Sequence, residues 1–416
     1  MSSRETSGPS AVGLAVAGTA AVATAFGMAR YGYGLLLPDI QDDLMLGATM
    51  LGAIGTLGYC TYMLATVLVT RCVARAGARA TVVAGGLCAV AGTIVVALAT
   101  GPLVLGAGVA IAGASAGLVY PPFADAVEGL PDTIRARTLA TITCGTGWGV
   151  AFAAPIAMLA GDSWRWANSG FAVCAALSTV MAARTLPPSV GRIARDSQGA
   201  ARLLRRAAAP LLAAAVFIGL GSAAYWTFAV DHVRDAGLDQ TGGRVLLGVA
   251  GITSVVAIAA ADISQRLGAR RTFVCTALLE AAAVAATSTA AGSLPAVLVA
   301  AAVFGAAYNT AIAVAILWSA QVYADRPSAG AAAIAGGTGI GLLCGPLAGG
   351  VMADTVGLTA ALLGGAALIL AAALLASRHT NMTWPQREPA MHIGRQRRAQ
   401  RLRRGRHALS GSRRGE

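Results

Sequence analysis

The stretch GLLCGPLAGG, residues 341–350, places four glycines and one proline inside a run that is apolar enough to cross a membrane. Helices in lipid gain no hydrophobic energy by packing together, so small residues four apart are the usual device that lets two backbones approach. Gly341, Gly345 and Gly349 have this spacing, and Pro346 removes one backbone hydrogen bond from the helix. The stretch therefore predicts a membrane helix with one glycine face, which serves either sliding between conformations or static packing.

Apolar runs of this kind recur along the whole chain. Of its 416 residues 56% are hydrophobic and 12% are charged, and the mean hydropathy is +0.68. Ordinary globular chains carry about 25% charged residues, and a helix of about 20 mostly apolar residues spans a bilayer. Twelve such runs are separated by polar residues, at about 11–37, 47–70, 80–99, 102–123, 138–161, 166–186, 209–230, 243–262, 272–291, 294–318, 329–352 and 357–377.

Two joints between these runs are short, at residues 101–102 and 292–293, so merging across both gives ten helices as the alternative count. The first run follows a polar leader and has about 27 residues, which exceeds the 7–15-residue core of a secretory signal peptide. We therefore expect it to remain as the first membrane helix.

The basic residues indicate the orientation of these helices. All 31 are arginine, and with the N-terminus inside, all but Arg30, Arg165, Arg234 and Arg244 fall on the cytoplasmic side. The positive-inside rule then places both termini in the cytoplasm. The net charge of +13 reflects this topology rather than nucleic-acid binding. The arginine-rich tail, residues 378–416, is expected to be a disordered overhang, with contact to anionic lipid as the alternative.

A shift of 191 residues aligns the two halves of the chain. ARAGARA (74–80) then falls on QRLGARR (265–271), and the alignment also pairs Arg135 with Arg326 and Pro155 with Pro346. Two repeats of six helices are expected to be parallel, related by an axis along the membrane normal. The expected organisation is a cytoplasmic leader (1–10), a first six-helix bundle (11–186), a cytoplasmic central loop (187–208), a second bundle (209–377) and the basic tail (378–416).

These motifs resemble those of the major facilitator superfamily of secondary transporters over nearly the whole chain. TRCVARAGARA corresponds to the family's G-x-x-x-D-R-x-G-R-R loop, with Thr70 and Ala74 where Gly and Asp are usual. GLLCGPLAGG matches G-x-x-x-G-P-x-x-G-G in full, although in proton-driven exporters that pattern is diagnostic in helix five, where this chain has VAFAAPIAML. The resemblance implies an all-α integral membrane fold with twelve transmembrane helices in two pseudo-symmetric six-helix bundles, active as a monomer.

By this resemblance, helices one, four, seven and ten line a central cavity, which directs attention to their polar and aromatic residues. Arg30 shares a face of the first helix with Phe26 and Tyr33. An arginine inside a membrane helix is costly, so Arg30 either binds an anionic substrate group or snorkels to the interface or to backbone carbonyls. The further substrate-binding candidates, each equally typical of packing or of an interfacial anchor, are Tyr120, Trp148, Tyr225, Trp226, Tyr308 and Asn309.

Proton coupling needs a titratable carboxylate that is reached from both sides in turn. Glu280 lies in the middle of helix nine, where a charge is costly, although the resemblance makes helix nine a peripheral support. Asp125, Glu128 and Asp262 lie at cytoplasmic helix ends, where they either pair with arginines to latch an inner gate or are ordinary solvated charges. The expected gating residues are Arg75, Gly77, Arg79, Arg266, Gly268, Arg270, Gly341, Gly345, Pro346 and Gly349.

The sequence argues against an enzyme. GASAG (113–117) matches G-x-S-x-G, but a nucleophile elbow needs a strand-to-helix turn and a histidine partner, and this match lies in a membrane run. The seven cysteines are scattered, so neither a disulfide framework nor a metal site is indicated, and no cofactor is expected.

The sequence therefore predicts a secondary active transporter of the inner or plasma membrane that works by alternating access. Proton-coupled export of a small organic compound, as an efflux antiporter, is the first expectation. Proton-coupled uptake of an organic anion is the second, and a membrane sensor that does not transport is the third. The expected partners are a small-molecule substrate, the proton and the lipid bilayer, without nucleic acid.

Overall fold

The computed structural model describes residues 10–127, 129–186, 208–323 and 327–378, so nearly all of the leader, the central loop and the tail lie outside the described residues. The described ranges are helical and contain no strand. The elements are α1 (Ala11–Val22), the π-helix η1 (Ala23–Met28), α2 (Gly32–Leu35), α3 (Leu37–Leu44), α4 (Ala48–Ala97), α5 (Pro102–Val127), α6 (Asp132–Leu159), α7 (Trp164–Thr185), α8 (Ala209–Asp235), α9 (Gln240–Thr253), the 3₁₀-helix η4 (Ser254–Ala259), α10 (Ala260–Leu267), α11 (Ala269–Thr289), α12 (Leu294–Val322), α13 (Pro327–Val356) and α14 (Leu358–Ser377).

Twelve segments of the described chain are long and apolar enough to cross a membrane, which confirms the predicted count. The two short joints are real breaks. Helix α4 ends at Ala97 before α5 begins at Pro102, and α11 ends at Thr289 before α12 begins at Leu294. The alternative count of ten is therefore wrong.

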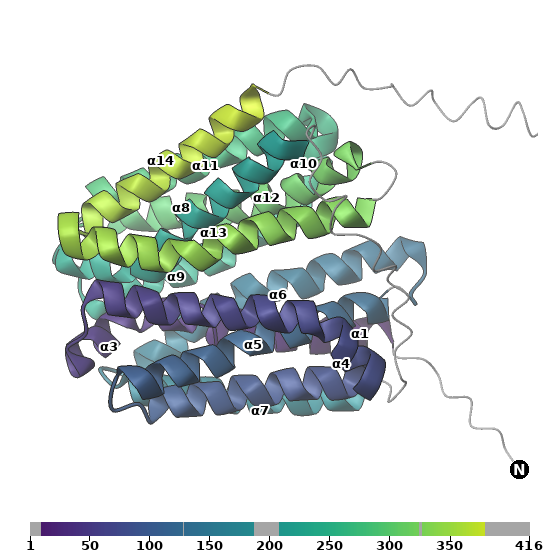
Figure 1. The fold of residues 1–416 in the computed structure, drawn as a ribbon, viewed down its shortest axis with the longest axis horizontal. Coiled ribbons are helices and arrows are strands. Elements are labelled where there is room, and N and C mark those ends of the chain that lie inside the picture. Colours follow the sequence, from purple (N-terminus) through teal and green to yellow (C-terminus); the bar gives the residue numbers. More distant parts are fainter. Residues whose placement is uncertain (1–9, 128, 187–207, 324–326, 379–416) are drawn as a thin grey trace, which may run out of the picture. The chain divides into compact units, whose positions relative to one another are not determined.

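The helices form two groups, α1 to α7 and α8 to α14, coloured purple to blue and teal to yellow (Figure 1). Helix α13 packs against α4, and α6 packs against α9, so these two pairs join the groups. Consecutive spans joined by short turns run in opposite directions. We call the membrane side at which α1 begins the near side, and the opposite side the far side.

The repeat predicted from the 191-residue shift reappears in the backbone. Helix α4 contains two membrane spans that meet at Gly77, where φ is +84°. The aligned glycine of the second half, Gly268, also has φ +84° and separates α10 from α11. Side chains disfavour this region of φ, so each half needs a glycine at the near-side turn between its second and third spans.

The prediction of one regular helix over residues 11–37 is wrong at its centre. The chain passes from α1 through the π-helix η1 into a turn at residues 29–31, and then through the short α2 into α3. Glycines on both sides of the turn lie against other backbones. A Cβ at Gly27 would overlap Gly149 of α6, and one at Gly34 would overlap the Trp226 carbonyl of α8. Single π-helical turns inside α-helices are frequent at functional sites.

The glycine face predicted for residues 341–350 packs against α8. A Cβ at Gly341 would overlap the carbonyl oxygen of Val216, and one at Gly345 would overlap the side chain of Ala223. Gly349 lies against the ring of Phe228, where an added Cβ would be 3.2 Å from the nearest ring carbon. This face is therefore a site of direct backbone contact between α13 and α8.

The proline side of the same stretch faces α4 and has a loosened hydrogen-bond ladder. The hydroxyl of Thr56 on α4 donates to the carbonyl of Leu343 at 3.0 Å and accepts from the amide of Leu347 at 3.3 Å. Pro346 lies between these two residues and supplies no amide hydrogen of its own. A side chain inserted into a helix ladder is a known cause of bending, so the contact between the two helix groups is made at a weak point of α13.

We predict that Gly341→Ala destabilises the protein by about 1–3 kcal/mol, because the added methyl group meets the backbone of α8. Gly336→Ala in the same helix is the matched control, since a Cβ there meets nothing within 4 Å. The free energies of unfolding of both variants, measured by denaturant titration in detergent, should differ accordingly. Equal stability of the two variants would contradict close packing at Gly341.

Candidate functional site

Arg30 lies in the turn that follows the π-helix, among four aromatic rings. Its guanidinium carbon is 4.2 Å from the ring centroid of Tyr59 and 4.2 Å from that of Tyr62, both on α4. The centroids of Phe26 and Tyr31 lie at 5.6 and 5.4 Å. A cation within about 6 Å of an aromatic face is attracted by the quadrupole of the ring. The rings therefore hold the guanidinium in place without neutralising its charge.

The guanidinium of Arg30 lacks polar partners for part of its hydrogen-bonding capacity. Its Nε and Nη2 atoms are shielded from solvent and have no hydrogen-bond partner. Within the described part of the chain, no acidic side chain forms an ion pair with Arg30. A buried donor without an acceptor is costly, and a buried charge is more so. The site is therefore complementary to an anion.

A second set of aromatic rings, from α8 and α12, continues from Tyr31. The Tyr31 and Trp226 centroids are 4.6 Å apart, which connects the broken first helix to α8. Trp226 is 5.3 Å from Phe304 and 5.8 Å from Tyr308, and Phe304 is stacked on Tyr225 at 3.7 Å. Three of the predicted residues, Tyr225, Trp226 and Tyr308, are thus brought together beside Arg30.

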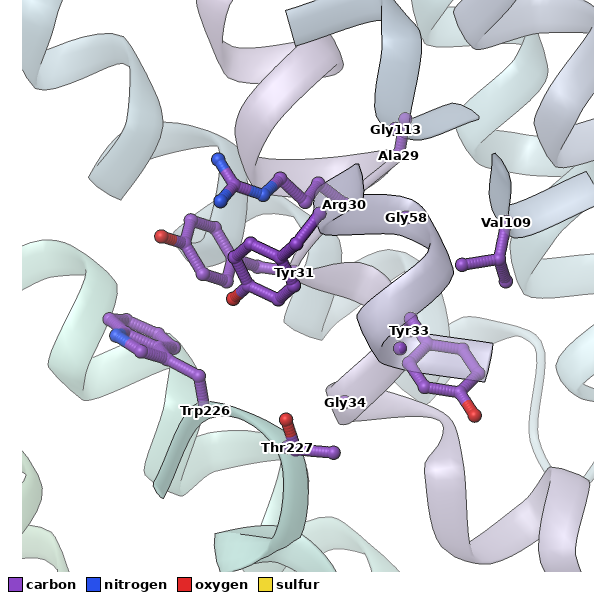
Figure 2. Close-up of a pocket in the computed structure, with 12 residues that line it drawn as sticks. Ala29, Arg30, Tyr31, Tyr33, Gly34, Gly58, Val109, Gly113, Trp226 and Thr227 are labelled. Atoms are coloured by element: carbon purple, nitrogen blue, oxygen red, sulfur yellow. The ribbon is translucent and has the colours of Figure 1, made fainter. Parts of the chain in front are cut away.

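Figure 2 shows the residues that line a small cavity, with Arg30 and Tyr31 on one side and Trp226 and Thr227 of α8 on the other. Its free volume is about 20 Å³, and a cavity needs about 10–15 Å³ to hold one water. Such a space cannot hold an organic molecule. The two helix groups must therefore separate at this point before the site can be occupied.

The remaining candidates on the first, fourth, fifth and tenth spans have different surroundings. The Tyr33 hydroxyl donates to the Leu51 carbonyl at 2.8 Å, although its ring lines the cavity. Tyr120 packs edge-on against Phe26 and shares a hydrogen bond with Thr143. The side chain of Asn309 donates to the carbonyl four residues earlier in its own helix.

Trp148 is 38% exposed and packs against Phe152, so the structure does not bring it to the ring cluster around Arg30. Sequence reasoning missed four rings of that cluster, namely Tyr31, Tyr59, Tyr62 and Phe304. Tyr59 and Tyr62 could have been paired from the sequence, because residues three apart lie on one face of a helix.

The four predicted carboxylates lie in different environments. Glu280 is fully buried in α11, and its Oε1 lies 2.5 Å from the hydroxyl of Ser222 on α8. Asp262 is exposed in the first turn of α10, towards the near-side end of the span Gln240–Leu267, and Asp125 is partly buried towards the end of α5. Glu128 lies outside the described residues. Burial therefore distinguishes Glu280 from the other two described carboxylates.

The predicted near-side arginines Arg75, Arg79 and Arg266 are exposed, and Arg270 is partly buried. Their role in gating stays a prediction. The glycines between them have the backbone conformation that the turn requires.

A buried ion pair joins the two helix groups on the far side, which the sequence did not predict. Arg244 of α9 is 3% exposed, and its Nη2 is 3.0 Å from Asp39 of α3. The same guanidinium donates to the carbonyls of Ala157 and Gly161, both at 2.8 Å. These three acceptors satisfy most of the donors of Arg244, although its Nε is buried without a partner, and a buried charge pair depends on such hydrogen bonds.

Further polar contacts surround this pair. Arg234 pairs with Asp42 and lies 3.8 Å from Asp39, which also accepts from Gln240. The carboxylate of Asp354, near the end of α13, accepts from the amides of Ala48 and Thr49 at 3.0 and 2.8 Å, and so caps the start of α4 from the other helix group. These contacts join the two helix groups on the far side, beneath an open hollow of about 780 Å³ that Asp39, Arg234 and Gln240 help to line.

The fold and sequence are similar to those of known proteins. The sequence profile described as Major Facilitator Superfamily matches residues 19–266 and again residues 211–408. A solved structure of a mutant of the nucleoside transporter NupG has a TM-score of 0.74 at 11% identity, over 88% of this chain and 100% of that one. A D-xylose-proton symporter has a TM-score of 0.72 at 13% identity, over 89% and 98%. Among curated protein sequences, none matches this chain.

We predict that Asp39→Asn destabilises the protein by about 3 kcal/mol, because it leaves the buried Arg244 charge without its counter-ion. Asp43→Asn is the matched control. Its partner Arg165 belongs to the same helix group, both side chains are about 40% exposed, and such pairs contribute about 1 kcal/mol at most. The free energies of unfolding of both variants are measured by denaturant titration in detergent. An equal loss of stability in the two variants would contradict a buried far-side ion pair.

Proposed function

Because the chain belongs to the major facilitator superfamily, we propose that it is a secondary transporter that binds a small organic anion at Arg30 and moves it by alternating access. The single observation that carries the proposal is the Arg30 guanidinium, which lies among aromatic rings without an ionic partner. An ionisable side chain inside a membrane protein is by default a functional candidate. A carboxylate or similar anion satisfies both unpaired nitrogens of a guanidinium at once.

The rings beside Arg30 support an anion with a flat or apolar part. Tyr31, Trp226 and Tyr308 offer ring faces next to the charge, and aromatic groups favour offset-stacked or edge-to-face contact with other rings. Aromatic carboxylates combine both features. We therefore place them first among the candidate substrates.

The distribution of arginine supports an orientation with the near side in the cytoplasm, both termini inside, and the protein in the inner or plasma membrane. The closed network around Asp39 and Arg244 then faces the exterior. Separation of α3 from α9 at this network is the step that would admit substrate from outside.

Proton symport, and hence uptake, agrees best with an anion site. An inside-negative potential opposes anion entry by about 2.3 kcal/mol per charge for each 100 mV. An anion that travels with one proton moves no net charge, so this opposition vanishes. The similarity in fold to a D-xylose-proton symporter is compatible with this mode.

Proton-coupled export of the same anion is the second candidate. It rests on the general resemblance to proton-driven exporters, whose G-x-x-x-G-P-x-x-G-G pattern this chain carries in full in helix eleven, at residues 341–350, and only as VAFAAPIAML in helix five. Symport carries protons in the same direction as the anion, and antiport carries them in the opposite direction. In sealed vesicles, an inward anion gradient should acidify the lumen in the first case and alkalinise it in the second.

We predict that Arg30→Ala lowers the apparent affinity for the transported anion by about tenfold or more, since charge-assisted hydrogen bonds contribute about 1.5–3 kcal/mol. The assay is counterflow of radiolabelled benzoate or succinate in proteoliposomes. Arg30→Lys should retain more affinity than the alanine variant, because it keeps the charge but loses the planar fork.

The control for this experiment is Arg165→Ala, which removes an arginine from a half-exposed far-side ion pair and should leave counterflow unchanged. Unaltered affinity in Arg30→Ala would exclude Arg30 as the anion-binding residue. Binding without flux in the unmodified protein would identify a sensor instead of a transporter.

A further inference from the structure

Glu280 is a carboxyl group in the middle of a membrane span, with no contact to solvent. It lies in α11, which spans Ala269–Thr289, and its exposed fraction is 0%. Within the described residues no ion pair includes it. One of its oxygens, Oε2, is buried without a hydrogen-bond partner. The transport site described above does not use this group.

The hydrogen bonds around Ser222 determine where the proton of this carboxyl group lies. The Ser222 oxygen is 2.5 Å from the backbone carbonyl oxygen of Ile218 and 2.5 Å from Glu280 Oε1. A hydroxyl group has one hydrogen, and a backbone carbonyl can only accept. When Ser222 donates to Ile218, the hydrogen between Ser222 and Glu280 must come from Glu280. The arrangement therefore fits a protonated carboxyl group that donates through Oε1.

No charged side chain of the helices packed directly against α11 lies near the middle of the span, where Glu280 is. Helix α11 packs against α8, α10, α12 and α14. The titratable groups of these elements are Tyr225, Asp231, His232, Arg234 and Asp235 on α8, Asp262 and Arg266 on α10, and Tyr308 on α12, and α14 has none. The charged residues of α8 lie at its far-side end, where the His232 ring contacts the Ser288 carbonyl. The charged residues of α10 lie towards the near-side end of the span Gln240–Leu267. Tyr308 is the one titratable residue of α12, which packs against α11.

Tyr308 also connects this carboxyl group with the anion site. It lies on α12, which packs against α11, and its ring packs against Trp226, which lines the cavity together with Arg30. An anion bound to Arg30 neutralises the one positive charge of this region. A negative charge on Glu280 then becomes less favourable, and by reciprocity a protonated Glu280 favours the anion.

We propose that Glu280 is the proton-binding residue of this transporter and that Tyr308 lies between it and the anion site, which rests on the anion transport proposed above. When the helix groups rearrange and water reaches the carboxyl group, the O–H bond at Oε1 breaks, its electron pair stays on the carboxylate, and the proton passes to water as hydronium. The carboxylate then accepts a hydrogen bond from Ser222. Proton binding from the other side reverses these changes.

The first test needs no substrate. Infrared spectra of the purified protein at neutral pH should contain the carbonyl band of a protonated carboxyl group that is missing in Glu280→Gln. Glutamine has the shape of the protonated acid and can still donate to Ser222, so folding should be retained. Asp262→Asn is the matched control, because it removes an exposed carboxylate and should leave the band unchanged.

A band of the same size in Glu280→Gln would overturn the assignment. Should that variant fail to fold, Ser222→Ala gives an independent reading, because the carboxyl group then loses the acceptor of its hydrogen bond. The band should move to the frequency of a carboxyl group without that bond, and an unmoved band would equally overturn the proposal.

The second test measures coupling in proteoliposomes with benzoate and succinate as probes. Glu280→Gln should retain counterflow and lose at least about tenfold of the accumulation driven by a pH gradient, whereas Asp43→Asn, which removes a half-exposed far-side carboxylate, should retain both. Accumulation unchanged in Glu280→Gln would exclude Glu280 as the coupling residue. If the unmodified protein shows no counterflow with benzoate and none with succinate, the proposed anion transport is contradicted. The infrared band would still show whether Glu280 is protonated.

Discussion

The structure depends on the close approach of helix backbones at glycine. Lipid supplies no hydrophobic reason for two apolar helices to pack together, so their association rests on van der Waals contact and on polar bonds between them. Gly341 lies against the backbone of α8, and Gly27 lies against Gly149 of α6. The second contact has a chemical consequence, because it lies in the π-helix directly before the turn that carries Arg30. Packing at glycine and the position of the charged side chain are therefore parts of one arrangement.

A comparison of two buried arginines separates structural charge from functional charge in this molecule. Arg244 has a carboxylate and two backbone carbonyls, which together satisfy most of its donors. Arg30 has aromatic faces, and two of its nitrogens lack an acceptor. Both residues carry the cost of a charge removed from water, but only for Arg244 is that cost offset within the described chain. An unpaired Arg30 is expected if the substrate is an anion that supplies the negative charge and the hydrogen-bond acceptors.

The sequence predicted the features that depend on local composition and on the repeat. Twelve apolar runs gave twelve spans, and the 191-residue shift identified Gly77 and Gly268, which share φ +84°. The break in the first helix was not predictable from residues 11–37, because it follows from contacts with α6 and α8. The same holds for the Tyr59 and Tyr62 rings around Arg30 and for the Asp39–Arg244 pair, whose members lie far apart in the chain. Glu280 was identified by its position in a membrane run, but its bond to Ser222 required the fold.

The proposed mechanism requires that an organic anion binds directly to the Arg30 guanidinium. Solid-state NMR can measure it through the dipolar coupling between ¹³C-carboxylate benzoate and ¹⁵N-labelled arginine side chains in membranes, with Arg30→Lys identifying the signal. If the anion binds Arg30 directly, a strong coupling to one guanidinium should be observed, and it should disappear in the lysine variant. A coupling that persists in that variant, or a bound benzoate without coupling to any arginine, would contradict it.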